Sequence, residues 1–357
     1  MGIQNYATTA PRSGIFLGKI YKDAIPKERL ARHGRAEMLP MNSSDTYKGR
    51  RYLPYGATST SADTINRFFA NGTGDRVAAL VQAHQSQEGM TGPPDHLSAV
   101  DTTVLIQEYD CLYSYTNKTA ELYEDDIPAE QTKKTGNRIS LVNEMIIFLA
   151  LKACTNVYYG GTGTSLATVN GPFTLNLQNR ILRNLDANHA EEITSMIAAS
   201  PKYDTAPIGS GYLAFVHTDL RSTIQGISGF VNPYQYASNK PMEGEIGAVD
   251  RVRFIGHPDM VSQQDAGAAV AAAPGMVSQS ASNVDVYSGI VMGADAWSHI
   301  VVRGKKGVAP VHIPHTQRDK SDPHGRKGYV GASWRKAVML ENNGWMAAFH
   351  VCAESLS

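Results

Sequence analysis

The sequence is poor in cysteine and in charge. Its three cysteines, Cys111, Cys154 and Cys352, lie far apart and form no CxxC pair. This spacing excludes a disulfide framework and a zinc finger, and predicts buried free thiols. Charged residues make up 18% of the chain, below the roughly 25% that is usual in soluble domains. Such a low content fits a large monomer with neutral polar loops, and it fits equally well a surface that lies against other subunits.

The sequence also lacks an excess of either charge and lacks long apolar runs. It has 33 basic and 33 acidic residues, so the formal net charge of +0 indicates no special class of partner. No apolar run reaches the roughly 18 residues needed to cross a bilayer. The first residues, MGIQNYATTAPRSG, contain no secretory signal, and Tyr6 departs from the myristoylation pattern. We therefore predict a soluble, cytosolic chain with no membrane partner.

Motifs of catalytic or cofactor-binding sites are missing as well. GGTGTS (160–165) lacks the spacing and the Lys of a phosphate loop. GSGYLA (209–214) leads into a predicted strand, whereas a dinucleotide motif would open a helix. There is no GxSxG sequence and no Cys beside a suitable His. The sequence thus predicts no enzyme and no cofactor.

The histidines His312, His315 and His324 are the candidates for a metal site. Prolines beside them break any helix that could hold two imidazoles on one face, so ordinary loop histidines are favoured. An acidic patch precedes the longest predicted helix: Glu121, Glu124, Asp125 and Asp126. Acidic residues there complement the positive end of the helix dipole. No metal site is predicted.

The first 50 residues predict an arm rather than a folded core. Their basic residues are Arg12, Lys19, Lys22, Lys27, Arg29, Arg32, Arg35, Lys48 and Arg50, against Asp23, Glu28, Glu37 and Asp45. A short helix is predicted at 26–33, because Pro26 suits a first turn. A basic arm can contact nucleic acid or latch onto an acidic neighbouring subunit. We favour the latch.

Two strands are predicted next, at 46–55 and 100–116, with a long excursion between them that includes a helix near 75–84. Both strands mix β-branched, aromatic and charged residues, so neither has a clean apolar face. Isolated two-stranded ribbons are marginally stable in water. The ribbon therefore needs another surface on which to lie.

The clearest helix is predicted at 128–154, where apolar residues recur every three or four positions on two flanks. Further helices are predicted at 175–185, 187–199 and 220–226. Strands are predicted at 212–217, 249–255, 284–292 and 300–303. The low-complexity stretch 265–283 is predicted to be a flexible, peripheral loop.

The C-terminal stretch from Ser321 to Val351 predicts a sheet closure. Asp322-Pro323 and Gly325 are turn residues, and Gly328 and Gly331 allow close approach of a neighbouring backbone. ENNGW (341–345) predicts a hairpin turn between two apolar strands.

Three segments together resemble the podovirus-type family of tailed-phage major capsid proteins, whose fold is shared by phage shells and encapsulins. They are EGEIGAVDRVRFI (243–255), the preceding AFVHTDLRSTIQGISGFVNPYQYA, and the DP-x-G-x-x-G-x-VG pattern at 322–331. The resemblance runs from about Lys48 to Val351. The insertion at 58–87 is longer than the family pattern.

The resemblance implies an α+β fold of four parts. These are an N-terminal arm (1–45), an extended loop with a β-ribbon (46–115), a peripheral domain with the long spine helix (116–171 and 318–357), and an axial domain (172–317). It also implies that the extended loop lies on the adjacent subunit. The residues expected to contact other subunits are Arg29, Arg32, Arg35, Arg50, Arg51, Tyr52 and Tyr55.

The function implied is that of a structural capsid protein, assembled in the host bacterial cytoplasm and located in the virion. It would form hexamers and pentamers of an icosahedral head around double-stranded DNA, which it contacts without sequence preference. Portal, scaffolding and decoration proteins would be further partners. Two alternatives stay open: an encapsulin-like compartment for protein cargo, and a soluble α/β enzyme.

Overall fold

The computed structural model describes residues 28–40, 44–53, 97–194, 209–236, 241–302, 308–318 and 320–356, and residues 78, 81, 82, 84–86, 88 and 89. The chain forms two compact units. Unit 1 takes its described residues from segments 1–47, 105–148 and 299–338. Unit 2 takes its described residues from segments 48–104, 149–298 and 339–357. The predicted helix near 75–84 lies largely outside the described residues.

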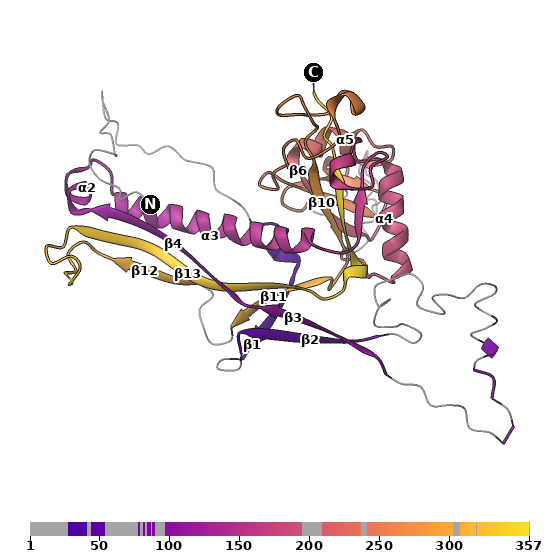
Figure 1. Ribbon diagram of the computed structural model, residues 1–357, viewed down its shortest axis with the longest axis horizontal. Helices are drawn as coiled ribbons and strands as arrows, with labels where there is room; N and C mark the ends of the chain where they lie inside the picture. Colours follow the sequence, from indigo (N-terminus) through magenta and orange to yellow (C-terminus); the bar gives the residue numbers. More distant parts are fainter. Residues whose placement is uncertain are drawn as a thin grey trace. The chain divides into compact units, whose positions relative to one another are not determined.

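Unit 1 is built on a long antiparallel pair, β4 (Gln107–Thr116) and β13 (Lys327–Leu340) (Figure 1). Strand β12 (Val308–Ile313) pairs with β13 at residues 329–334. Strands β11 (Trp297–Val302) and β1 (Arg35–Leu39) complete a five-stranded sheet. At Gly331 an added Cβ would collide with the Cys111 carbonyl oxygen, and this explains the predicted need for glycine.

Helix α3 (Ile127–Lys152) packs on this sheet and confirms the predicted spine helix. Its 26 residues span about 39 Å at 1.5 Å per residue. The Asp126 carboxylate accepts a hydrogen bond from the Ala129 N–H at 3.2 Å and caps the first turn. Ile139 and Val142 then pack against a cluster of buried sheet residues that includes Trp334. The helix thus buries part of the apolar face that its periodicity predicted, and its fully buried apolar residues lie in the second half, within 140–152.

Unit 2 contains a seven-stranded sheet in the order β5-β14-β10-β6-β9-β8-β7. Its strands are β5 (Val157–Tyr159), β6 (Tyr212–His217), β7 (Phe230–Val231), β8 (Glu245–Val249), β9 (Val252–His257), β10 (Tyr287–Met292) and β14 (Met346–Val351). Helices α4 (Leu175–Ala187) and α5 (Arg221–Gln225) contribute apolar residues to its core. The predicted strand 212–217 and the predicted helices 175–185 and 220–226 are confirmed.

The hairpin predicted at ENNGW is wrong. Asn342 does form a turn, since its Oδ1 accepts from the Gly344 N–H at 3.0 Å. The strands on either side, however, belong to different sheets: β13 pairs with β4 in unit 1, and β14 pairs with β10 and β5 in unit 2. A turn sequence fixes a local reversal, but partners far away in the chain decide which strands pair.

Three other local predictions need correction. Residues 188–194 are turns and irregular structure, so the helix predicted at 187–199 is wrong where the structure describes it. The strand predicted at 249–255 is two strands, β8 and β9, joined by a tight turn in which Asp250 has φ +51°. The segment 265–283 is not peripheral throughout, because Ala273 is 2% exposed and packs with Val169 and Val284.

A buried ion pair holds the β8–β9 turn region of unit 2. Arg253 Nε and Nη2 donate to the two carboxylate oxygens of Glu245, each at 2.8 Å. Tyr236 donates its hydroxyl proton to the same carboxylate at 2.5 Å. Burial and the Glu245 carboxylate both raise the Tyr236 pKa above its usual value. Two of the charged residues in the segment EGEIGAVDRVRFI, Glu245 and Arg253, therefore have a structural role.

Candidate interaction surfaces

The ribbon consists of β2 (Thr46–Tyr52) and β3 (Ala99–Leu105), and none of its strand residues is buried. Arg50 makes a two-pronged contact with Asp101: Nε donates at 2.7 Å and Nη2 at 3.0 Å. Lys48 Nζ lies 2.8 Å from the same carboxylate. These cations hold the Asp101 pKa well below its usual range. The charges clamp the strands together without giving the ribbon a core.

Three of the predicted contact residues lie on one strand of the ribbon. Arg50, Arg51 and Tyr52 lie on β2, where Tyr52 is 59% exposed. Tyr55 lies outside the described residues. Because Arg50 forms an ion pair with Asp101, it connects β2 to β3 within the ribbon. Contact of these residues with another subunit stays a prediction.

The other predicted contact residues flank the end of the arm. Arg29 and Arg32 lie at a short 3-10 turn, η1 (Leu30–His33), and Arg35 begins β1. Arg35 Nη2 lies 2.7 Å from Glu37 Oε1, and Tyr47 donates its hydroxyl to Glu37 Oε2 at 3.4 Å. The residues from 28 to 40 are therefore attached to unit 1, with β1 as a strand of its sheet.

Glu144 of α3 is the residue that anchors this turn, and the sequence analysis missed it. The side chain is 1% exposed, and its two carboxylate oxygens accept from the N–H groups of Leu30, at 2.9 Å, and Ala31, at 3.0 Å. Leu30 itself is fully buried. The available signal was a single acidic residue within the apolar run LVNEMIIF. Such a carboxylate needs buried donors.

Burial lowers the pKa values of two basic side chains near this anchor. Burial lowers the pKa of His33, the Arg32 charge lowers it further, and Glu144 opposes both. Burial also lowers the Lys336 pKa, while Glu28 and Glu144 raise it. The anchor is thus a partly buried cluster of charges from the arm, α3 and β13.

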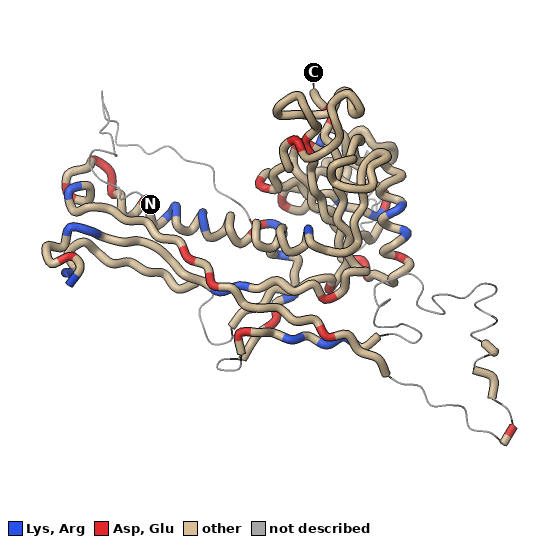
Figure 2. The backbone as a smooth tube through the Cα atoms, viewed as in Figure 1, with Lys and Arg blue, Asp and Glu red and all other residues tan. Residues whose placement is uncertain are grey.

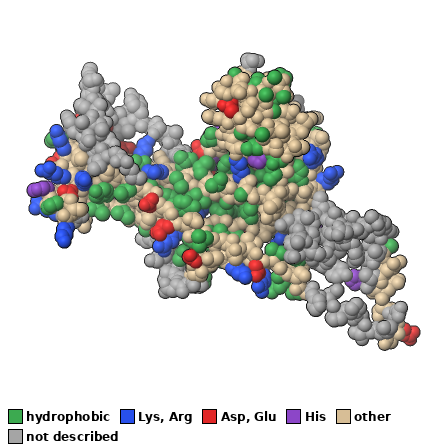
Figure 3. Space-filling view, viewed as in Figure 1, with side chains coloured by type: hydrophobic (Ala, Val, Ile, Leu, Met, Phe, Trp, Pro, Cys, Tyr) green, Lys and Arg blue, Asp and Glu red, His purple; other side chains and the backbone are tan. Residues whose placement is uncertain are grey.

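The second half of α3 carries an apolar stripe that the described residues cover only in part. Leu141, Met145 and Leu149 follow one another at four-residue steps, none of them is buried, and Leu149 is 72% exposed. In the first half of the helix the exposed positions carry no large apolar side chain, and they include Thr132, Lys133 and Lys134. Hydrophobic side chains gather along this region in Figure 3. An exposed apolar surface of this kind marks an interaction site.

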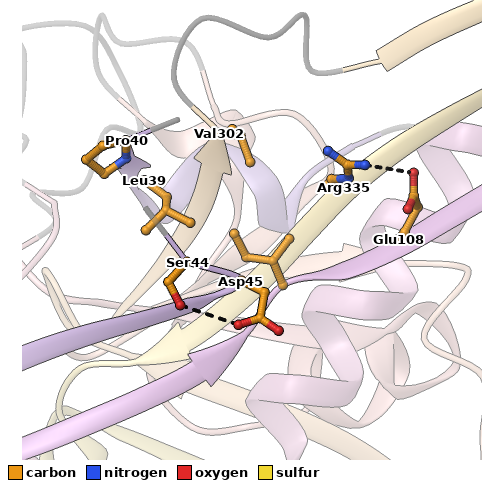
Figure 4. Close-up of a pocket in the computed structure, with 8 residues that line it drawn as sticks. Leu39, Pro40, Ser44, Asp45, Glu108, Val302 and Arg335 are labelled. Atoms are coloured by element: carbon orange, nitrogen blue, oxygen red, sulfur yellow. Dashed lines mark hydrogen bonds and ion pairs between the residues drawn. The ribbon is translucent and has the colours of Figure 1, made fainter. Parts of the chain in front are cut away.

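A pocket of about 370 Å³ lies in unit 1 where β1 ends and the ribbon begins (Figure 4). Leu39, Ile106 and Val302 give it apolar walls. At its rim Arg335 Nη2 lies 3.3 Å from Glu108 Oε1. The lining residues include no His, Cys or Lys, and the Ser44 hydroxyl donates to the Asp45 carboxylate at 3.4 Å.

Among the described residues of unit 2, Ser288 and His350 form a hydrogen-bonded pair that is buried. Ser288 Oγ lies 2.9 Å from His350 Nδ1, across neighbouring positions of β10 and β14. Their exposed fractions are 2% and 6%. Burial, and then the Lys152 charge, lower the His350 pKa to about 4. A substrate cannot reach this serine.

The described residues contain no group of three or more His, Cys, Asp or Glu side chains placed to hold a metal ion. His315 instead lies 3.4 Å from Glu121, and Asp322 accepts backbone N–H groups of Arg326 and Lys327. Among the described helices, none combines the length and hydropathy of a membrane span. The surfaces that stand out are therefore the ribbon, the anchored arm and the apolar stripe of α3.

The chain was compared with known proteins by sequence and by structure. No protein-family model matches the chain. A curated major capsid protein of Pseudomonas phage KPP21 is 22% identical over 267 residues, which cover 70% of this chain and 66% of that protein. The match thus spans just under two thirds of the relative's own length.

Solved capsid structures match over nearly the whole chain. The capsid of Ralstonia phage GP4 has a TM-score of 0.60 at 11% identity, over 97% of this chain and 96% of that one. The capsid of cyanophage P-SCSP1u has a TM-score of 0.58 at 11% identity, over 96% and 93%. The cyanophage Pam1 capsid has 0.57 at 12% identity, over 97% of each chain. The chain has the fold of these phage capsid proteins, which confirms the predicted fold class.

Proposed function

We propose that this chain, similar in sequence to one phage major capsid protein and in fold to several others, is a structural capsid protein of a tailed phage. It is not an enzyme, and its place is the capsid of the virion. The observation that carries this conclusion is a capsid fold that extends over 97% of the chain, together with the curated capsid relative. The uncovered ribbon and helix stripe agree with it.

Copies of the chain assemble into hexamers and pentamers of an icosahedral head that encloses double-stranded DNA. The support is physical. Repeated head-to-tail contacts close into rings, and the ribbon and the α3 stripe expose surface that a neighbouring copy covers. Portal, scaffolding and decoration proteins are the further partners expected of such a head.

The chain divides into arm, extended loop, peripheral domain and axial domain in this proposal. The ribbon acts as the extended loop and lies on the adjacent copy, with Arg51, Tyr52 and Tyr55 at the contact and Arg50 holding the strands in place. Arg29, Arg32 and Arg35 belong to the arm that contacts a neighbour. DNA is confined rather than bound tightly, in agreement with the balanced net charge.

Deletion of residues 47–100 tests this role of the ribbon. The residues on either side of the deletion, Thr46 and Asp101, belong to strands that pair with each other. A short Gly-Ser linker can therefore join them. We expect a folded, soluble subunit that forms no shells, because the described ribbon residues contribute no buried side chain to either unit's core except Leu53.

The matched control removes exposed ribbon charges without removing the ribbon. Lys48→Gln with Arg50→Gln should lower the yield of shells but not abolish it, since the backbone ladder remains. Sedimentation and electron microscopy measure both variants. Normal shells from the deletion would remove the ribbon from the assembly mechanism while leaving the capsid class intact.

A further inference from the structure

The loop that joins β12 to β13, together with the first residue of β13 (residues 314–327), is a basic surface at one end of unit 1. We call it the basic loop. Its charged side chains point to solvent: Arg318, Lys320, Arg326 and Lys327 are all exposed. None of these four forms an ion pair with the residues that the structure describes. The Asp322 carboxylate is occupied by the N–H groups of Arg326, at 2.7 Å, and Lys327, at 2.8 Å.

An acidic segment, residues 121–126, lies beside the basic loop. It joins α2 (Asn117–Leu122) to α3 and contains four acidic residues and no basic one. Glu121 and Glu124 are exposed, whereas Asp126 caps α3. The segment therefore has carboxylates beyond those that its own helix needs.

Both surfaces are fixed to the same end of unit 1. The Asn117 N–H donates to the Arg326 carbonyl oxygen at 3.0 Å, and Thr116 is the strand partner of Lys327. Within one copy, His315 Nε2 of the loop lies 3.4 Å from Glu121 Oε1 of the acidic segment. In Figure 2 the acidic segment lies on the upper side of this end and the basic loop on the lower side.

We propose that the basic loop of one copy binds the acidic segment of a second copy. The inference rests on the proposed function, because it needs copies that assemble, and it names the surface by which unit 1 contacts its neighbour. Opposite charges on two sides of one end are self-complementary in a head-to-tail arrangement. Single exposed ion pairs contribute little, but several in one repeated contact determine orientation and register.

A second copy is favoured over nucleic acid for a reason within the chain. The basic loop carries Asp319 and Asp322 among its cations, and its complement, a segment without Lys or Arg, is present on every copy. Repeated phosphates would favour a loop without carboxylates. A nucleic-acid contact is thus a competing outcome that the test must separate.

The test is a charge exchange in the full chain. One variant reverses the basic loop (Lys320→Glu with Arg326→Glu), a second reverses the acidic segment (Glu121→Lys with Glu124→Lys), and a third carries all four changes. Each two-site variant should form shells at least about tenfold less efficiently at 0.15 M salt, because like charges then face each other. The four-site variant should form shells with an efficiency within about twofold of the natural chain, because the two surfaces again carry opposite charges.

Two controls separate contact from folding. Arg221→Glu, an exposed reversal on α5 of unit 2, should assemble as the natural chain does. Thermal unfolding of each unassembled variant should match the natural chain, including Glu121→Lys, which also removes the His315 pair.

Folded variants whose assembly is not restored by the four-site exchange would overturn the proposal. So would basic-loop variants that form normal shells but fail to retain DNA, since that result assigns the loop to nucleic acid. If the natural chain forms no shell at all, the proposed function fails, and this inference fails with it.

Discussion

At the scale of single residues, the buried ionisable groups fix how stability responds to pH. His350 has a pKa of about 4 in the folded chain because burial and the Lys152 charge disfavour its protonated form. In the unfolded chain its pKa is about 6.5. Between these values the unfolded state binds the proton and the folded state does not. The free energy of unfolding therefore falls as the pH drops through 6.5 toward 4.

We predict that this residue makes the dissociated subunit about 2 kcal/mol less stable at pH 5 than at pH 7. His350→Gln should remove that part of the difference, because Gln can still bond the Ser288 hydroxyl but binds no proton. Urea denaturation at both pH values measures it. An equal loss of stability in His350→Gln would assign the pH response to other groups.

Glu144 gives a second prediction at this scale. Glu144→Gln keeps the size of the side chain but leaves one oxygen where two accepted from Leu30 and Ala31. An unmade buried hydrogen bond costs about 1–3 kcal/mol, so the turn at 30–33 should open more often. Trypsin should then cleave after Arg32 and Arg35 roughly 5- to 100-fold faster.

The control for this measurement is Glu130→Gln on the exposed part of the same helix, where Glu130 pairs with Lys133. Its cleavage rate should equal that of the natural chain. Equal rates for Glu144→Gln and Glu130→Gln would show that Glu144 does not hold the arm.

The sequence could not identify the partners of these groups, for a physical reason. Glu144 and Leu30 are 114 positions apart, and His350 and Ser288 are 62 apart. Pairs of this kind leave no spacing pattern in the chain. By contrast, Asp322 and Gly325 were predicted as turn residues because their chemistry is local, and Gly325 does adopt a φ of +64°.

At the scale of elements, the second half of α3 has two flanks with different roles. Ile147 and Leu151 are fully buried on one flank, whereas the stripe on the other ends at Leu149, which is 72% exposed. In the proposed shell a neighbouring copy covers this stripe. Burying one leucine side chain contributes about 1.5–3 kcal/mol per copy.

We therefore predict that Leu149→Arg folds normally but assembles poorly. The side chain is 72% exposed in the single chain, so thermal unfolding should change little. In the shell the same change would bury an unpaired charge. Shell yield by sedimentation checks this, with Lys133→Gln in the polar half as the control. Full assembly of Leu149→Arg would mean that the stripe stays uncovered.

Local elements were predictable where one pattern dominates. The apolar repeat of α3 and the apolar run of β6 are clear patterns, so the bounds of both elements were found nearly to the residue. The error at ENNGW was of another kind. Its turn residues are as predicted, but β14 pairs with β10 and β5 and not with β13, the strand on the other side of the turn.

At the scale of the whole molecule, the order of elements carried more information than any motif. A ribbon, a long helix, an inserted sheet and a closing strand are the parts that resemble phage capsid proteins. The capsid structures match this order over nearly the full chain at 11–12% identity. The seven-stranded sheet was not predictable as such, because its central neighbours β10 and β14 are joined only by long-range pairing.

The central claim is that this chain carries surfaces which become covered only when its own copies surround them. Negative-stain electron microscopy of the purified full-length protein, over a range of concentrations and with ultracentrifugation alongside, tests it most directly. The account predicts closed particles or rings of subunits. A monodisperse species of 38.7 kDa at every concentration, with nothing larger ever formed, would contradict it.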